Sequence, residues 1–244
     1  PDSFSDGGRF LAPDSAVAHA RKLMAEGADI LDIGWESTRP GASSVTAEEE
    51  WGRVAPVLEG VLGLGVPVSV DTCKPEIMVR AARMGAAMIN DVNALRVPGA
   101  LEALAASDAA VCLMHMLGEP RTMQQDPSYR NVVEEVLEFL RQRVSACERA
   151  GIVRDRIVVD PGFGFGKTVE HNLLLLRFLE RLASLGLPVL AGLSRKSTLG
   201  RITGRSESER VNASVAAALL AVQNGANIIR VHDVAATRDA LAVL

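Results

Sequence analysis

Short apolar runs rich in Val and Ile alternate with longer amphipathic stretches along the whole chain, and this alternation is the feature that most constrains the fold. Runs that are apolar at nearly every position are typical of parallel strands, which are buried on both faces of a sheet. Seven runs are expected to form strands: Asp29–Gly34, Val66–Asp71, Ala87–Asp91, Ala110–His115, Ile157–Asp160, Val189–Leu193 and Ile228–Val231.

Helices are expected in the gaps, and several of them have start or stop signals. Thr46 precedes an acidic run, Pro75 lies in a first helical turn, and Gly85 follows the end of the same helix, as helix caps require. The predicted helices are Asp14–Glu26, Ala47–Leu62, Pro75–Arg83, Pro98–Ala106, Asn131–Ala150, Val169–Ser184, Glu207–Asn224 and a last one from Ala236.

Repeated strand–helix units indicate an α/β fold. A single (β/α)₈ TIM barrel over residues 1–244 is the preferred interpretation, because such a barrel takes about 250 residues and this chain has 244. An aromatic content of 4% argues against an all-β sandwich. A strand should precede the opening segment PDSFSDGG, so the barrel is expected to lack its first strand in this chain. A doubly wound open sheet is the alternative.

Charge and composition exclude several classes of partner. The net charge is −4, without a basic stripe for nucleic acid. No apolar run approaches the roughly 18 residues of a membrane helix, and the start of the chain carries no signal-peptide core. The three cysteines show no C-x-x-C pattern, which favours a reducing cytoplasm.

Polar side chains lie at the carboxyl ends of nearly all the predicted strands. In parallel α/β folds this end carries the ligand site, although any one such residue could instead cap the following helix. The residues concerned are Asp32, Asp71, Asn90, Asp91, His115, Asp160, Ser194, Arg230 and His232.

Several loops after these strands contain chemistry suited to a small ligand. The segment DPGFGFGKT (160–168) resembles a phosphate-binding P-loop, but Pro161 stands where that motif needs Gly. Its glycines are expected to let Phe163 and Phe165 project from a tight loop. Arg230 and His232 lie two residues apart on one side of a strand, where they suit an anionic group. His115 could be a metal ligand, but a packing role is preferred.

Taken together, these segments resemble the dihydropteroate synthase family from end to end. The matching segments, in order, are PDSFSDGG (1–8), EGADILDIG (26–34), ESTRPGA (36–42), VSVDTCKP (68–75), IND (89–91), LMHM (113–116), PRTMQ (120–124), VVDPGFGFGKT (158–168), GLSRKS (192–197) and RVHDV (230–234).

The resemblance implies a (β/α)₈ barrel that condenses 6-hydroxymethyl-7,8-dihydropterin pyrophosphate with p-aminobenzoate and releases pyrophosphate. Loss of pyrophosphate would come first, followed by attack of the aromatic amine. It also implies Mg²⁺ as cofactor, a homodimer formed through outer helices, and loops 1–10 and 35–45 as lids. The exposed-looking runs 173–176 and 215–220 would permit that dimer.

The resemblance also assigns residues to each substrate, with Lys196, Arg230, His232 and Asp71 as the catalytic set. The pterin would contact Asp71, Asn90, Met114, Asp160, Phe165, Lys196 and Arg230. The p-aminobenzoate pocket would contain Phe4, Thr38, Arg39, Pro40, Phe165 and Ser197. Pyrophosphate would bind Thr38, Arg39, Arg230 and His232.

Two departures from the family stand out. The family Asn that helps to bind Mg²⁺ would lie upstream of Pro1, so no metal ligand is predicted within the chain. Trp35 replaces a family Gly, and either the loop is rearranged or the indole packs over the pocket mouth. A pterin-dependent methyltransferase would explain Asp71, Asn90 and Asp160 but not SRKS or STRPG, and a pterin-binding barrel without activity is the remaining alternative.

Overall fold

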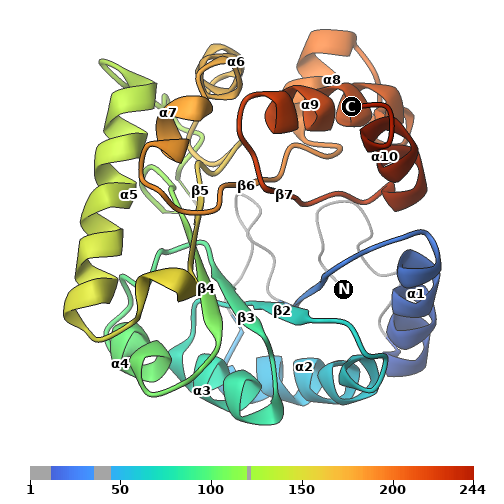
Figure 1. The fold of residues 1–244 in the computed structure, drawn as a ribbon, viewed down its shortest axis with the longest axis vertical. Helices are drawn as coiled ribbons and strands as arrows, with labels where there is room; N and C mark the ends of the chain where they lie inside the picture. Colours follow the sequence, from blue (N-terminus) through green and yellow to red (C-terminus); the bar gives the residue numbers. More distant parts are fainter. Residues whose placement is uncertain (1–11, 36–44, 120–121) are drawn as a thin grey trace.

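The computed structural model describes residues 12–35, 45–119 and 122–244, and within them seven short parallel strands form the centre of the molecule (Figure 1). Five strands lie in the order β1-β2-β3-β4-β5, and a second sheet pairs β6 with β7. Their bounds are Leu31–Gly34 (β1), Val68–Asp71 (β2), Met88–Asp91 (β3), Ala110–Met114 (β4), Ile157–Asp160 (β5), Leu190–Ala191 (β6) and Ile228–Ile229 (β7).

The helices surround the strands on the outside, as Figure 1 shows. They are Pro13–Ala25 (α1), Ala47–Leu62 (α2), Pro75–Met84 (α3), Ala100–Ala105 (α4), Val132–Arg149 (α5), Val169–Arg177 (α6), Glu180–Ala183 (α7), Ser197–Thr203 (α8), Val211–Gln223 (α9) and Val234–Leu241 (α10), with 3₁₀ turns at Arg154–Arg156 and Glu207–Glu209. Among the described residues, no helix combines the length and the apolarity needed to cross a bilayer.

The strand order supports the barrel interpretation. Each strand pairs in parallel with its sequence neighbour from β1 to β5, and an isolated bridge between Val159 and Val189 connects β5 to the β6–β7 sheet. A doubly wound sheet would instead reverse its strand order at a switch point. The fold is therefore of the TIM-barrel type. No pairing joins β7 to β1 within the described part of the chain.

Local capping explains where several helices begin and end. The Thr46 hydroxyl accepts a hydrogen bond from Glu49 N (3.2 Å), and the Glu49 carboxylate accepts one from Thr46 N (2.9 Å), which forms a complete capping box. Pro75 occupies the first turn of α3, and Gly85 ends that helix at φ +113°. These start and stop signals are confirmed.

Three helical predictions needed correction. The predicted helix 169–184 breaks after Arg177 into α6 and α7, and Leu179 and Leu182 beyond the break are both fully buried. The predicted helix 207–224 begins as a 3₁₀ turn and becomes α-helical only at Val211. Helix α8 was not predicted, because its sequence, STLGRIT, has an internal Gly200 and little apolar periodicity.

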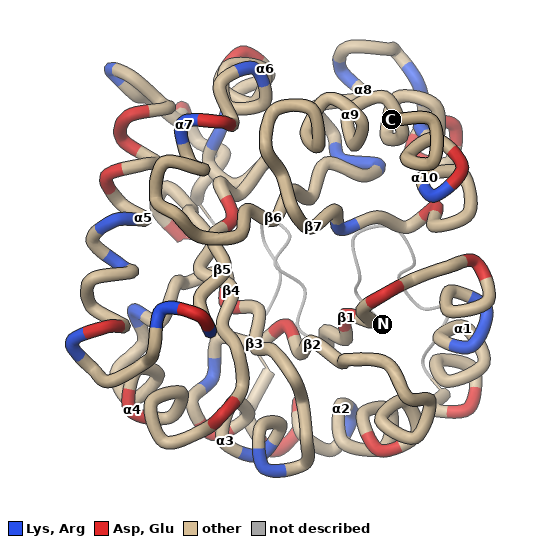
Figure 2. The backbone as a smooth tube through the Cα atoms, in the orientation of Figure 1, with Lys and Arg blue, Asp and Glu red and all other residues tan. Residues whose placement is uncertain are grey.

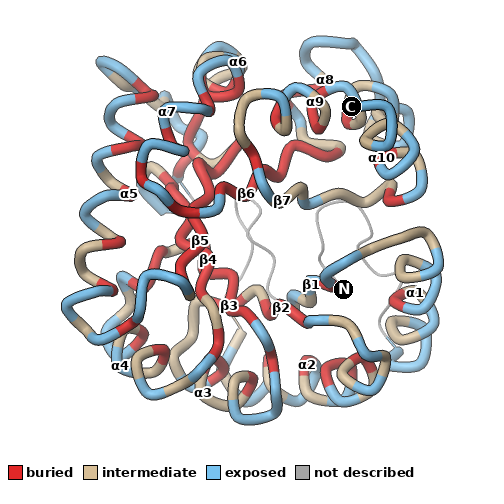
Figure 3. The backbone as a smooth tube through the Cα atoms, viewed as in Figure 1, coloured by how far each residue is buried: buried red, intermediate tan, exposed pale blue. Residues whose placement is uncertain are grey.

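Side chains along each strand point alternately outward, toward the helices, and inward, toward the barrel interior. Outward-facing side chains such as Val70, Ile89 and Val159 pack against the helices in the main core. Figure 3 shows β3, β4 and β5 buried and β7 only half-buried. Inward-facing Met88, Cys112, Val158 and Leu190 form a separate apolar cluster. Two positions further along, Asn90, Met114 and Asp160 lie on β3, β4 and β5 and Gly192 lies just after β6. Together with Asp71 at the end of β2, Asn90 and Asp160 form what we call the polar layer, above the apolar cluster.

Candidate active site

The predicted site residues of the described chain converge at the carboxyl ends of the strands. A cavity of about 1420 Å³ is lined by several of them, and Asn90, Met114 and Asp160 lie almost fully buried at the ends of β3, β4 and β5. The site residues that line the cavity are Asp71, Phe165, Lys196, Ser197, Arg230 and His232. The predicted residues Phe4, Thr38, Arg39 and Pro40 lie outside the described residues.

Three hydrogen-bond acceptors lie together in the polar layer. Asp71 and Asn90 are register partners on β2 and β3, and Asp160 ends β5. Asn90 Oδ1 is buried without a hydrogen-bond partner in the described structure. A buried acceptor left unsatisfied costs about 1–3 kcal/mol. This layer therefore suits a ligand that presents several N–H donors.

Burial shifts the ionisation of both carboxyl groups of this layer. Burial raises the pKa of Asp71 to about 7, although the positive charge of Arg230 lowers it. Burial also raises the pKa of Asp160, opposed by Lys196 and by the hydrogen bond that Asp160 Oδ1 accepts from Gly162 N (2.6 Å). Carboxyl groups with a strongly shifted pKa beside a cavity are typical of functional sites.

Arg230 lies between two carboxylates. Its Nε is 2.6 Å from Asp32 Oδ2, and its Nη2 donates to Asp71 Oδ2 at 3.2 Å. Asp32 raises the pKa of Arg230 further, so the guanidinium stays charged. A fixed, half-exposed guanidinium at a cavity is suited to a phosphate group.

Lys196 is held against the glycine-rich loop that follows β5. Its Nζ donates to the Phe163 carbonyl (2.5 Å) and lies 4.7 Å from the centre of the Phe165 ring. Burial lowers the pKa of Lys196 to about 8, and Asp160 opposes this shift. The ammonium therefore lies over an aromatic face and near a carboxylate.

Both Phe163 and Phe165 line the cavity, but the prediction that Phe163 projects from the loop is wrong, whereas Phe165 stays partly exposed. The Phe163 side chain is 1% exposed and belongs to the main hydrophobic core, because the loop turns it inward while its carbonyl accepts from Lys196. Phe165 instead packs with four residues that form an apolar wall: Val92, Met114, Met116 and Met123. Val92, Met116 and Met123 were not predicted, although the LMHM and PRTMQ segments contain the two methionines.

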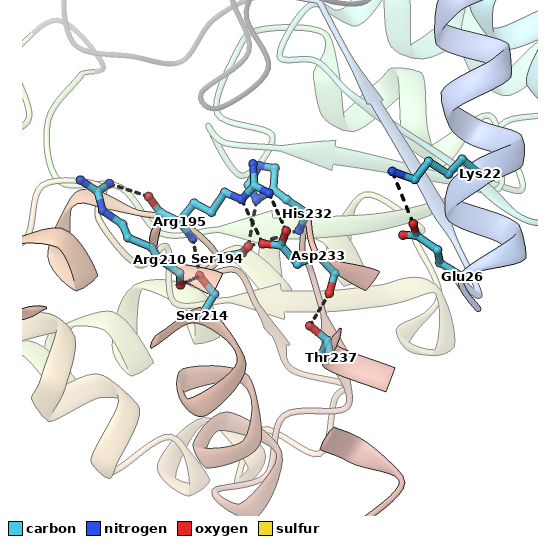
Figure 4. Close-up of polar contacts among 9 residues, drawn as sticks. All are labelled: Lys22, Glu26, Ser194, Arg195, Arg210, Ser214, His232, Asp233 and Thr237. Carbon is cyan, nitrogen blue, oxygen red and sulfur yellow. Dashed lines mark hydrogen bonds and ion pairs between the residues drawn. The ribbon is translucent and has the colours of Figure 1, made fainter. Parts of the chain in front are cut away.

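Hydrogen bonds connect the loop after β6 to the loop after β7 (Figure 4). The Ser194 hydroxyl lies 2.9 Å from His232 Nδ1 and accepts from His232 N at 3.2 Å. In the next position of each loop, Arg195 Nε donates to Asp233 Oδ2 at 2.9 Å. Arg195 has a left-handed backbone (φ +56°), and such strain in a non-glycine residue is concentrated at functional sites.

The strained turn at Arg195 is supported by the beginning of α9. The Ser214 hydroxyl accepts from Arg195 N (2.9 Å), and Arg210 Nη1 donates to the Arg195 carbonyl (2.8 Å). These supports hold the backbone that carries Lys196 and Ser197. Neither Arg210 nor Ser214 was predicted, because they are distant in sequence from the strand ends.

His115 has a packing role, as preferred from the sequence. It is 5% exposed, its ring makes an edge contact with Phe139 (4.9 Å between centroids), and its Nδ1 lies 2.9 Å from Lys167 Nζ. The described residues include no group of three or more His, Cys, Asp or Glu side chains that could hold a metal ion.

Comparison with known proteins decides the family. The family model described as pterin binding enzyme matches residues 1–232. The dihydropteroate synthase of Neisseria meningitidis serogroup B is 55% identical over 250 residues, which cover 100% of this chain and 88% of that protein. This chain belongs to the dihydropteroate synthase family.

Solved structures of the dihydropteroate synthase family have the same fold. The Yersinia pestis dihydropteroate synthase, in complex with a sulfonamide drug, superposes with a TM-score of 0.98 at 45% identity, over 100% of this chain and 89% of that chain. The Burkholderia cenocepacia enzyme, complexed with 7,8-dihydropteroate, gives a TM-score of 0.90 at 52% identity, over 95% of this chain and 86% of that chain.

Trp35, at which the family resemblance led us to expect a Gly, has a backbone conformation that does not require glycine. It is not among the described non-glycine residues with positive φ. Its ring lies 5.3 Å from the Arg53 guanidinium, and the residue lines the cavity and packs against the core. Of the two alternatives for Trp35, packing at the cavity is thus observed; the loop 36–44 lies outside the described residues.

Proposed function

We propose that this protein condenses 6-hydroxymethyl-7,8-dihydropterin pyrophosphate with p-aminobenzoate to give 7,8-dihydropteroate and pyrophosphate. Its membership of the dihydropteroate synthase family supports this activity, and the Burkholderia cenocepacia relative is described as a complex with the product. The observation that carries the proposal is the buried, unpartnered Oδ1 of Asn90 beside Asp71 and near Asp160.

The pterin ring is assigned to the polar layer of the barrel. Its amino and ring N–H groups would donate to Asp71, Asn90 and Asp160, which supply acceptors where water is excluded. Met114 belongs to the apolar wall and Phe165 packs against it, an arrangement that suits the faces of a flat ring. Lys196, next to Phe165, would lie between the pterin and the aminobenzoate.

Pyrophosphate is assigned to Arg230 and His232, with Thr38 and Arg39 outside the described residues as further partners. Both Arg230 and His232 line the cavity, and Ser194 orients the His232 ring. Negative charge develops on the leaving oxygen as the C–O bond of the pterin methylene group breaks. Preorganised cationic donors stabilise such charge most strongly when water is excluded.

The aminobenzoate amine would then attack the methylene carbon, lose a proton and form the new C–N bond. Ser197 is exposed at the start of α8 and lines the cavity together with Phe165, so it could bind the aminobenzoate carboxylate. Phe4, Thr38, Arg39 and Pro40 would complete this pocket. Sulfonamides, one of which is bound in the Yersinia pestis relative, are expected to compete at the same position.

Magnesium has no ready protein site among the described residues, so no step of the reaction is assigned to it. Mg²⁺ commonly binds through one or two protein ligands together with substrate phosphates. We therefore propose that Mg²⁺ accompanies the pyrophosphate group. EDTA should abolish turnover while the binding of a pterin that lacks pyrophosphate stays unchanged.

A homodimer and a cytoplasmic location complete the proposal. Apolar side chains are exposed on α6 and α9, which contact each other: Leu173 is 47% and Leu220 is 48% exposed. Light scattering after size-exclusion chromatography tests the dimer, and Leu220→Glu should give a monomer. The three cysteines, Cys73, Cys112 and Cys147, form no disulfide, which supports a reducing compartment.

The decisive assay mixes the protein with the pterin pyrophosphate, Mg²⁺ and labelled p-aminobenzoate. Labelled dihydropteroate should form, and its formation should depend on the pyrophosphate group. Pterin binding without product would instead support the alternative of a binding protein without activity.

A further inference from the structure

Lys167 is a buried lysine that the proposed reaction does not use. Its side chain is 3% exposed, and it follows directly after the glycine-rich loop 161–166. Lys167 lines the cavity, but despite the P-loop-like sequence around it, its side-chain nitrogen is engaged by its own loop and by His115. It points back into its own loop.

The Lys167 side-chain nitrogen has three close polar partners, and burial lowers the pKa of Lys167 well below the usual lysine value. Nζ lies 2.9 Å from His115 Nδ1, 3.0 Å from the Gly162 carbonyl and 2.9 Å from the Phe165 carbonyl. A fourth, longer contact reaches the His115 carbonyl at 3.4 Å. Lys167 thus ties both ends of the loop to the segment that follows β4.

The space between the loop and this segment admits no other side chain. A Cβ on Gly162 would lie 1.9 Å from the His115 carbonyl oxygen, and one on Gly166 would lie 2.7 Å from Leu117 Cβ. The two backbones are therefore in direct contact. Two further loop carbonyls accept hydrogen bonds from residues outside the loop: Gln124 donates to Gly164 O, and the Tyr129 hydroxyl donates to Gly166 O at 2.8 Å.

The peptide groups that Lys167 holds lie beside the groups assigned to the substrates. Gly162 N donates to Asp160 Oδ1 at 2.6 Å, and the Phe163 carbonyl accepts from Lys196 at 2.5 Å. Phe165 provides the ring that lies 4.7 Å from Lys196 Nζ. A shift of the loop would therefore displace Asp160, Lys196 and the Phe165 ring together.

We propose that Lys167 is a positioning residue, which fixes the glycine-rich loop through His115 and thereby sets Asp160, Lys196 and Phe165 for pterin binding. The inference rests on the proposed function for the identity of the ligand. A misplacement of about 1 Å in a preorganised site can cost about 100-fold in rate. A folded variant that lacks the Lys167 contacts should therefore still lose pterin affinity.

The test compares K167M with R156M. Arg156 is also a cation that donates to carbonyls, those of Leu104 and Ala109, but it does so just before β5, at the opposite end of that strand from Asp160. Binding of the dihydropterin pyrophosphate is measured by calorimetry at a temperature where circular dichroism shows both variants folded. K167M should weaken binding about tenfold or more and raise KM for the pterin more than it lowers kcat, whereas R156M should bind within about twofold of the wild type.

K167Q keeps an amide donor, so it should bind the pterin more tightly than K167M does. K167Q also replaces K167M in the test if K167M does not fold. Wild-type affinity in a folded K167M, or an equal loss in R156M, would overturn the inference. Failure of the unaltered protein to bind the pterin would contradict the proposed function itself, so the two failures are distinguishable.

Discussion

Arg230 Nε lies 2.6 Å from Asp32 Oδ2, so a cation that follows β7 is held by a carboxylate of β1. No strand pairing joins β1 and β7 within the described residues, and this ion pair spans the opening between them. The second contact of Arg230, to Asp71, connects the same guanidinium to the pterin acceptors. The proposed pyrophosphate ligand is therefore set in place before any substrate binds.

Replacing Arg230 by Lys should retain the positive charge but lose this geometry. An ammonium lacks the planar fork that contacts Asp32 and Asp71 together. We expect kcat/KM for the pterin pyrophosphate to fall about 100-fold, which corresponds to roughly 2.7 kcal/mol. Arg238→Lys is the matched control, because Arg238 pairs with the exposed Asp29. A loss of less than threefold in Arg230→Lys would contradict the assigned role of the guanidinium.

The pH dependence of turnover should reflect Asp71 and Lys196. Asp71, with its pKa raised to about 7, is protonated below that pH and then loses acceptor capacity. Lys196, with its pKa lowered to about 8, loses its charge above that pH. The kcat/KM for the pterin pyrophosphate should therefore be highest between the two values and fall on either side. Steady-state rates across this range test the prediction, and an unchanged kcat/KM would exclude both assignments.

The acidic run at the start of α2 shows what the sequence pattern could not resolve. Glu48 and Glu49 are exposed, as expected of a helix start, and Glu49 completes the capping box. Glu50 is instead fully buried and binds Thr72 Oγ1 (2.7 Å) and Lys74 Nζ (2.5 Å) in the segment after β2. Only the packing of α2 against the sheet reveals this difference, because the three residues are the same type in a row.

Strand ends were the most predictable part of the site. Asp71, Asn90 and Asp160 could be placed because a strand's side chains alternate and parallel strands end on one side. The loops were less predictable, since side-chain direction there depends on distant partners. Phe163 and Phe165 have similar sequence surroundings and both line the cavity, yet Phe163 is buried in the main core whereas Phe165 is only partly buried.

Gly162→Ala should be far more destabilising than a glycine substitution in the same backbone conformation elsewhere. Gly162 (φ +68°) has the His115 carbonyl oxygen 1.9 Å from the position of a Cβ, whereas Gly204 (φ +70°) has nothing within 4 Å. Left-handed strain alone costs about 1–2 kcal/mol, so Gly204→Ala should lose about that much in its free energy of unfolding. Gly162→Ala should lose at least about 3 kcal/mol, since backbone must also move. Urea unfolding measures both, and equal losses would contradict the close contact.

Ser194→Ala should impair His232 without removing it. The hydroxyl is the partner of His232 Nδ1 and N, so its loss leaves the imidazole less well oriented toward pyrophosphate. We expect kcat/KM for the pterin pyrophosphate to fall about tenfold, which corresponds to the roughly 1.4 kcal/mol of one lost hydrogen bond. Affinity for a pterin without pyrophosphate should stay unchanged. Weakened binding of that pterin would show that Ser194 supports the ring site instead.

The central claim is that the polar layer formed by Asp71, Asn90 and Asp160 binds the pterin ring. Calorimetric titration of Asp160→Ala with dihydropterin pyrophosphate, beside the unaltered protein, tests it most directly. The unaltered protein should bind the compound, and the folded variant should show no measurable binding. Retained affinity in Asp160→Ala would contradict the claim.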